Sequence, residues 1–335
     1  MYKPLFIRLS LLTIPAMMLM LQGCASSSSE PDGERTPVTF KAVTTDGNGS
    51  RAAIGKDEFA AAGSAFKVWG TMRNDATQPI IEFDGVNVES NGSQWLYNDL
   101  RYWFPGFYYS FRAVYPSDLT GVTFQTGTST ATDRLDIAGF DATSGLDILA
   151  ASHTRQASLG NDAVQLQFRH LLARIDIKAS IDNAIDDKSI TINSVRFIGF
   201  TTSGDWAGLD LESNPTGKWT LTTPDPSQAA YPAITMSQQL TSTPVSLLDG
   251  ENSVMVIPQS LPRSAKVEIT YTDSDSQPHV MKADLYTATA SLPNGLEASR
   301  LYSFRLVIGP EQYILFSNPT VSQWNDVSGG NFIIQ

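Results

Sequence analysis

Side chains that commonly carry out chemistry are few and scattered in this sequence. Its 335 residues include three histidines, His153, His170 and His279, and one cysteine, Cys24. The histidines form no pair at the short spacing of a metal site, and a single cysteine permits neither an internal disulfide nor a thiolate zinc cluster. The nucleophile elbow, the phosphate-binding loop and the His-Glu-x-x-His motif are all missing from the sequence. We therefore predict no catalytic residue, no metal site and no cofactor.

Carboxylates are the other groups that could act as acids, bases or ligands. A glycosidase needs two of them across a cleft, and the sequence singles out no pair among its 34 Asp and Glu residues. Asp273-Ser-Asp275 resembles the start of a calcium loop, but the glycine and the terminal glutamate of an EF-hand are absent. We expect a solvated hairpin tip there and a protein that is not an enzyme. A lipid-anchored hydrolase stays an alternative, and it would require a visible cleft with paired carboxylates.

The overall composition favours a folded, acidic protein. The formal net charge is −11, only 17% of the residues are charged, and 41% are hydrophobic. This is enough apolar material for a buried core, so global disorder is not expected. An acidic chain without a block of Lys and Arg cannot neutralise the phosphates of a duplex, which argues against nucleic-acid binding.

The single cysteine follows an export signal. Residues 1–23 combine two early basic residues with a thirteen-residue apolar stretch, Leu9 to Leu21, which is shorter than the roughly 20 residues of a membrane-spanning helix. The sequence then reads Leu21-Gln22-Gly23-Cys24 and resembles the lipobox of bacterial lipoproteins, in which the cysteine thiol carries diacylglycerol. We expect residues 1–23 to be a lipoprotein signal peptide and residues 24–36 to be a flexible, Ser-rich tether that begins with lipidated Cys24.

The rest of the chain has the pattern of β-strands. Apolar residues alternate with polar ones in many short runs, such as Val164, Leu166 and Phe168, and turn signals such as Asn-Gly separate these runs. The alternation changes phase near His170, which indicates a bulge or bend there. We interpret His170 itself as a hydrogen-bonded strand residue and not as a catalyst. We predict an all-β sandwich architecture, with a domain boundary in the polar stretch 153–162.

An aromatic segment, residues 95–115, permits two interpretations. It contains ten aromatic residues, among them Trp103, Tyr109 and Phe111. As a turn followed by a buried strand, it would contribute its rings to the core. As an exposed row, it would make the protein a surface glycan-binding lipoprotein. Buried rings would disfavour the second interpretation.

Several segments, in a fixed order, resemble the Bacteroides-type fimbrillin family, the subunits of type V pili. Besides the lipobox, these segments are Val38-Thr-Phe40 leading to Ser50-Arg51-Ala52, Trp103-Phe-Pro105 through Tyr115-Pro116, Asp147-Ile-Leu-Ala150, Leu166 to Ile175, Val256-Ile-Pro258-Gln259, Leu301-Tyr302-Ser-Phe304 and Val321-Ser-Gln-Trp324. Ala298-Ser299, where the family more often has a glycine, departs from the pattern.

The resemblance implies a fold, a place in the cell and partners. It implies two transthyretin-like β-sandwich domains in tandem, here residues 37–158 and 159–335. It also implies a lipoprotein of the outer membrane and cell surface that serves as stalk or anchor of a fimbria and supports adhesion. Its partners would be other pilus subunits and the membrane, through the lipid on Cys24; the resemblance names no surface ligand.

The resemblance further implies assembly by strand exchange. A trypsin-like protease cuts after the first strand, about residues 37–45, and a C-terminal extension of another subunit replaces that strand. Here the cut would follow Arg51, unless Arg51 is an ordinary solvated arginine. A cut at Arg35, the rival site, would free the tether and leave the strand in place.

Donor residues would come from the tail that begins near residue 313. The candidates are Tyr313, Leu315, Phe332 and Ile334, which flank a Gly329-Gly330 hinge. The alternative is that these segments complete the second domain's own sheet.

Overall fold

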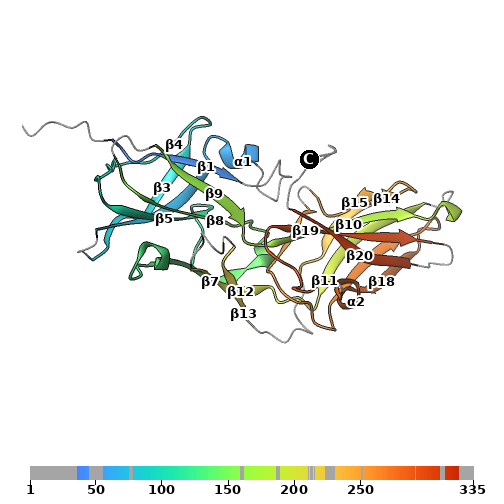
Figure 1. Ribbon diagram of the computed structural model, residues 1–335. Coiled ribbons are helices and arrows are strands. Elements are labelled where there is room, and N and C mark those ends of the chain that lie inside the picture. Colours follow the sequence, from blue (N-terminus) through green and yellow to red (C-terminus); the bar gives the residue numbers. More distant parts are fainter. Residues whose placement is uncertain are drawn as a thin grey trace, which may run out of the picture. The chain divides into compact units, whose positions relative to one another are not determined.

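The computed structural model confirms the predicted all-β fold (Figure 1). It describes residues 36–44, 56–74, 78–158, 162–185, 189–209, 211, 214, 216–222, 231–249, 252–290, 292–309 and 314–323. All of these belong to one compact unit, Thr36–Gln335.

The first half of this unit is built around a closed barrel. Its seven strands run in the order β1-β4-β3-β2-β5-β8-β9. They are β1 (Phe40–Thr44), β2 (Ala65–Arg73), β3 (Ile80–Ser90), β4 (Trp95–Leu96), β5 (Tyr108–Tyr115), β8 (Leu149–Gln156) and β9 (Val164–His170). Neighbouring pairs are antiparallel except β1 and β9, whose parallel pairing closes the barrel. Closure satisfies backbone groups that an open sheet would leave unpaired at its edges.

The other described strands form three further sheets. One has the order β15-β10-β19-β20 with β16 beside β10, the second β14-β11-β17-β18, and the third β13-β12-β7-β6. Their strands are β6 (Val122–Gln125), β7 (Arg134–Asp141), β10 (Ala173–Ile181), β11 (Ile190–Ile198), β12 (Ser203–Leu209), β13 (Lys218–Leu221), β14 (Ile234–Leu240), β15 (Val245–Ser246), β16 (Val254–Val256), β17 (Lys266–Thr272), β18 (Pro278–Asp284), β19 (Arg300–Ile308) and β20 (Ile314–Gln323). The third sheet joins strands from both halves of the sequence, because β7 pairs with β12.

Helices are short. The α-helices α1 (Lys56–Ala60) and α2 (Leu285–Thr289) have five residues each. Three single turns of 3-10 helix are η1 (Thr130–Thr132), η2 (Ala142–Ser144) and η3 (Asn183–Ile185). Among the described residues, no helix has the length and apolar character needed to span a bilayer.

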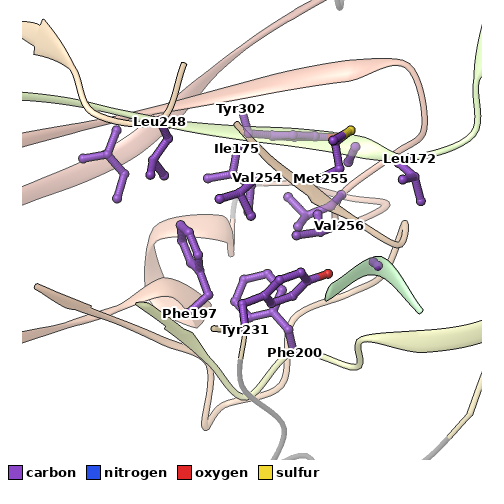
Figure 2. Close-up of a cluster of buried hydrophobic side chains, with 14 of the residues drawn as sticks. Leu172, Ile175, Phe197, Phe200, Tyr231, Leu248, Val254, Met255, Val256 and Tyr302 are labelled. Carbon is purple, nitrogen blue, oxygen red and sulfur yellow. The ribbon is translucent and has the colours of Figure 1, made fainter. Parts of the chain in front are cut away.

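Two clusters of buried hydrophobic side chains form the core. One fills the barrel, and the other lies between the sheets of the second half and extends under β7. Figure 2 shows part of the second cluster, in which Phe197, Phe200 and Tyr231 face Val254 and Val256. The continuous apolar run at β16 is buried at every position, as expected of a strand covered on both faces.

The chain passes from the first cluster to the second through a bend at Leu171 and Leu172, close to the position at which the alternation changes phase. Phe168 packs in the barrel, and Leu171 packs in the second cluster. Residues 159–170, which the sequence analysis assigns to the second domain, include β9, and β9 pairs with β1 and β8 of the barrel.

Buried polar contacts hold this bend. The His170 ring Nδ1 lies 2.9 Å from an Asp147 carboxylate oxygen, and both side chains are buried. The Ser299 hydroxyl donates to the His170 carbonyl at 2.8 Å, and the Leu171 N–H donates to the Ile148 carbonyl. A buried pair with additional hydrogen bonds restricts the bend to one geometry.

Gly199, which directly follows β11, allows a test of backbone packing. Its φ is +81°, and a Cβ there would lie 2.9 Å from the Ala265 Cα. Gly63 has a similar φ of +86° with nothing within 4 Å of such a Cβ. Gly63→Ala should cost about 1–2 kcal/mol, the penalty of a left-handed residue, and Gly199→Ala about 1–3 kcal/mol more because of the clash. Urea unfolding of both variants measures the difference, and equal costs would contradict the close approach of Gly199 to the Ala265 backbone.

Candidate functional site: the position of the first strand

The first strand of the barrel, β1, is short and lies between β4 and β9 (Figure 1). Val38, Phe40 and Ala42 are buried, whereas Thr39 and Lys41 are exposed. This is the period-two pattern of a half-buried strand. The alternation that the sequence shows from Val38 to Phe40 therefore places every second side chain of this segment in the barrel core.

Backbone pairing ties β1 mainly to β9. Five residue pairs, from Phe40–Val164 to Thr44–Phe168, join the two strands in parallel register. On the other side, a single pair, Phe40–Trp95, joins β1 to β4. Just before the strand, the Val38 N–H donates to the Arg101 carbonyl at 2.8 Å.

The Phe40 ring lies at the centre of an aromatic cluster. Its centroid is 5.5 to 6.2 Å from those of Phe66, Phe83, Tyr97 and Phe111, all in edge-to-face or near edge-to-face arrangements. Aromatic pairs prefer such geometry, which adds to the energy of burial. Three of these rings lie on β2, β3 and β5, and Tyr97 directly follows β4; we call the four rings the β1 pocket.

Tyr97 also binds the backbone of the first strand. Its hydroxyl donates to the Val38 carbonyl at 2.6 Å. Burial raises the pKa of Tyr97 above its ordinary value despite the nearby Arg101, so the hydroxyl keeps its proton at neutral pH. This contact can be made to the backbone carbonyl of any extended segment in the place of β1.

These features define what the site can do. If β1 left, the facing edges of β4 and β9 would lose their backbone partners, and the β1 pocket would lose its central ring. Both needs are met by another extended segment with alternating apolar side chains. The site is therefore suited to binding a strand, and its described residues hold no arrangement of reactive groups.

The processing candidates fall beside this strand in the sequence but outside the described residues. Arg51 lies between the end of β1 at Thr44 and the start of α1 at Lys56. Arg35 immediately precedes the first described residue, Thr36. The lipidation site Cys24 also lies outside the described residues.

Of the donor-strand candidates, only Leu315 is described. It lies on β20, opposite Val307 of β19, and its side chain is 44% exposed. β20 is the last strand of its sheet, and Phe316 stacks on Phe304. Tyr313, Phe332 and Ile334 lie outside the described residues.

The aromatic segment 95–115 does not form a continuous exposed row. Trp103, Tyr109 and Phe111 are buried in the barrel cluster, against which other rings of the segment also pack. Phe104 and Tyr108 are exposed. The turn-plus-buried-strand interpretation therefore describes most of the segment.

Several carboxylates and histidines in the described part of the chain have structural partners. Asp133 is paired with Arg73, and Asp147 with His170. His279 binds Asp273, whose other carboxylate oxygen accepts backbone N–H groups in the β17–β18 turn. His153 lies on β8, opposite Phe111 of β5. No group of three or more His, Cys, Asp and Glu residues suited to a metal occurs among the described residues.

Sequence reasoning did not find Phe66 and Phe83 as parts of this site. Both are buried within long strands, and no local pattern in the sequence identifies them as neighbours of Phe40. The Arg73–Asp133 pair also carried no signal, because 60 residues separate its members.

Comparisons with known proteins agree with this fold. A family model described as fimbrillin-like matches residues 50–324. A fimbrial protein from Bacteroides vulgatus is similar in fold, with a TM-score of 0.52 at 14% identity, covering 86% of this chain and 99% of that one. A candidate cell adhesion protein from Bacteroides ovatus gives 0.53 at 14% identity, covering 87% and 98%.

Another candidate cell adhesion protein, from Bacteroides uniformis, gives a TM-score of 0.51 at 16% identity, covering 86% of this chain and 99% of that one. No match was found among curated proteins. At these identities the solved structures share a fold with the chain, whereas the family model spans most of the sequence. The chain therefore belongs to the fimbrillin-like family.

Proposed function

We propose that this chain is a structural subunit, stalk or anchor, of a cell-surface pilus, and that subunits join by exchange of the first strand. Membership of the fimbrillin-like family and the similar fold of a fimbrial protein support the pilus role. The observation that carries the exchange mechanism is β1 itself. It fills the β1 pocket with a single phenylalanine ring, yet only one residue pair joins it to β4.

The proposed sequence of events begins with export. The chain leaves the cytoplasm as a lipoprotein and is tethered to the outer membrane through the lipid on Cys24. Cleavage after Arg51 then separates β1 from the rest of the barrel. Since cleavage also removes the tether, polymerising subunits lose their lipid, and an uncut copy would stay attached as an anchor.

The vacated position then accepts a strand from the tail of another subunit, which begins near residue 313. The incoming strand would pair with the edges of β4 and β9 and place an apolar side chain among Phe66, Phe83, Tyr97 and Phe111. Backbone hydrogen bonds would supply affinity, and the alternate side chains would supply specificity. Among the described strands, β20 lies at the edge of its sheet and pairs only with β19. Release of β20 to another subunit would therefore break the pairing with one strand.

Limited proteolysis with electron microscopy tests this proposal. Purified chain is treated with a low dose of trypsin, the cut is located by mass spectrometry, and oligomers are sought by microscopy. We expect the wild type to lose the segment before residue 52 and to form oligomers or fibres. Arg51→Ala combined with Lys56→Ala should stay monomeric, because Lys56 is the next basic residue after Arg51.

Arg35→Ala is the matched control, since a cut there leaves β1 in place, and this variant should assemble like the wild type. Efficient trimming after Arg51 without any oligomer would contradict strand exchange. Assembly of the variant that lacks both Arg51 and Lys56, without any cut, would also contradict it.

A further inference from the structure

A cavity lies on the outer face of the barrel, away from the position of β1. Arg73 and Tyr108 are paired neighbours on β2 and β5, and Met72 and Tyr109, next to them, point into the core. By alternation, Arg73 and Tyr108 lie on the outer face. The β6–β7 loop passes over this face and, with residues 78–79, lines a solvent-open pocket of about 640 Å³. This volume is in the range of about 300–1,000 Å³ that is usual for small-molecule sites.

The loop wall of the cavity is held in place from below. The Asp133 carboxylate accepts the Gly127 N–H at 2.9 Å, and Arg73 donates to the Gly127 carbonyl at 3.1 Å. Further along the loop, the Ser110 hydroxyl and the Arg112 guanidinium donate to the Thr130 carbonyl. Because these bonds are internal to the chain, the wall is preorganised and binding would cost little ordering.

The cavity is electrically neutral at its described lining. Arg73 is the one charged residue of that lining, and Asp133, which is fully buried, pairs with its guanidinium at 2.5 Å. The remaining polar lining side chains bear amides and hydroxyls: Asn74, Gln78, Thr126, Thr128, Ser129 and Thr130. At these described residues a phosphate or carboxylate ligand would find no uncompensated cation, and a metal would find no free carboxylate.

Tyr108 supplies an aromatic surface beside these polar groups. Its side chain is 41% exposed and lines the cavity. An apolar ring face flanked by amides and hydroxyls, each able to donate and accept, is complementary to a molecule with an apolar face and a rim of hydroxyls. Sugars in the pyranose form have this chemistry.

We propose that this cavity binds a neutral saccharide, with one sugar ring stacked on Tyr108 and its hydroxyls bonded to the loop 126–130 and to Gln78. The site would give the protein an adhesion ligand at the cell surface. The proposal does not depend on strand exchange, because none of the described lining residues belongs to β1.

Saturation-transfer NMR and calorimetry on the purified full chain test the proposal. The probes are galactose, glucose, mannose, fucose, N-acetylglucosamine and lactose, with sialic acid and glucuronic acid as charged controls. We expect at least one neutral probe to bind with a dissociation constant of about 1 mM, because a single sugar makes few contacts.

Tyr108→Ala should weaken that binding about tenfold or more by removing the stacking surface, and Tyr108→Phe should retain most of it. Phe104→Ala is the matched control, since Phe104 is similarly exposed at 42% but does not line the cavity. It should bind like the wild type.

Three results would overturn the proposal. They are the absence of binding by every neutral probe, binding that survives Tyr108→Ala, and a preference for the charged probes. If Tyr108→Ala impairs fibre formation while no saccharide binds, the cavity is a subunit contact and not a sugar site. If the chain binds sugar but forms no fibres, that result would contradict strand exchange and leave the saccharide proposal intact.

Discussion

Phe40→Ala is expected to lower the free energy of unfolding of the intact chain by about 3–5 kcal/mol. The Phe40 side chain is 5% exposed and touches all four rings of the β1 pocket. Its truncation leaves a cavity that these large rings, each fixed by other neighbours, cannot refill. Urea unfolding followed by tryptophan fluorescence measures the loss.

The same substitution separates strand exchange from an ordinary core role. In fibres formed after β1 is removed, Phe40 is no longer present, so trypsin-trimmed fibres of Phe40→Ala should dissociate in the same urea concentration as those of the wild type. Phe111→Ala, from β5 of the same pocket, should destabilise both the intact chain and the fibres. Fibres weakened by Phe40→Ala would show that β1 is retained on assembly.

Asp133→Ala is expected to lower the free energy of unfolding by about 3–5 kcal/mol, because it leaves a buried guanidinium without its counter-charge. Arg73 contacts both oxygens of this carboxylate, and the Thr71 hydroxyl donates to it at 2.6 Å. The carboxylate also holds the loop that forms the wall of the saccharide cavity, so the variant should lose sugar binding as well. Thermal and urea unfolding measure the first effect, and calorimetry with the sugar measures the second.

Asp136→Ala is the matched control for Asp133→Ala. Asp136 lies on β7, three residues further on, and pairs with Arg134; the two side chains are 16% and 43% exposed, against 0% and 9% for Asp133 and Arg73. Ion pairs that solvent reaches contribute about 0–1 kcal/mol, so this variant should lose much less stability than Asp133→Ala. Equal losses in the two variants would contradict a special role of the buried pair.

The Asp133 carboxylate should also make the free energy of unfolding depend on pH in acid. Burial by itself raises the pKa of Asp133, but hydrogen bonds from Arg73, Thr71 and the Gly127 N–H, together with the charge of Arg73, lower it below the ordinary value of 3.8. A lowered folded-state pKa means that the stabilisation is complete above pH 3.8 and is lost as the pH falls below it, through the folded-state value. Asp133→Ala should therefore flatten the fall in stability below pH 3.8, and an unchanged acid profile would contradict this assignment.

Local patterns in the sequence predicted much of the site. Val38 and Phe40 alternate with polar residues, and the structure buries both of them in or beside a strand. The period of two is a local property, because successive side chains of any strand point to opposite faces. For the same reason the phase change near His170 indicated the bend that separates the two hydrophobic clusters.

Local patterns could not predict which side chains from distant parts of the sequence contact each other. The aromatic run marked Phe111 as core, but only the strand order of the barrel brings it, together with Phe66 and Phe83, around Phe40. Alternation of Tyr109, Phe111 and Ala113 agrees with the burial of the Tyr109 ring, but it could not show that the exposed ring of Tyr108 lies beside the β6–β7 loop.

The sequence by itself therefore determined the all-β class, the position of the first strand and the resemblance to fimbrillins, since these rest on residues close together or on motifs in a fixed order. The tertiary structure alone decided that β9 closes the barrel against β1, that Asp133 neutralises Arg73, and that Tyr108 lines a neutral cavity. Each of these contacts joins residues that are distant in the sequence, and their pairing depends on sheet order and register, which local alternation does not specify.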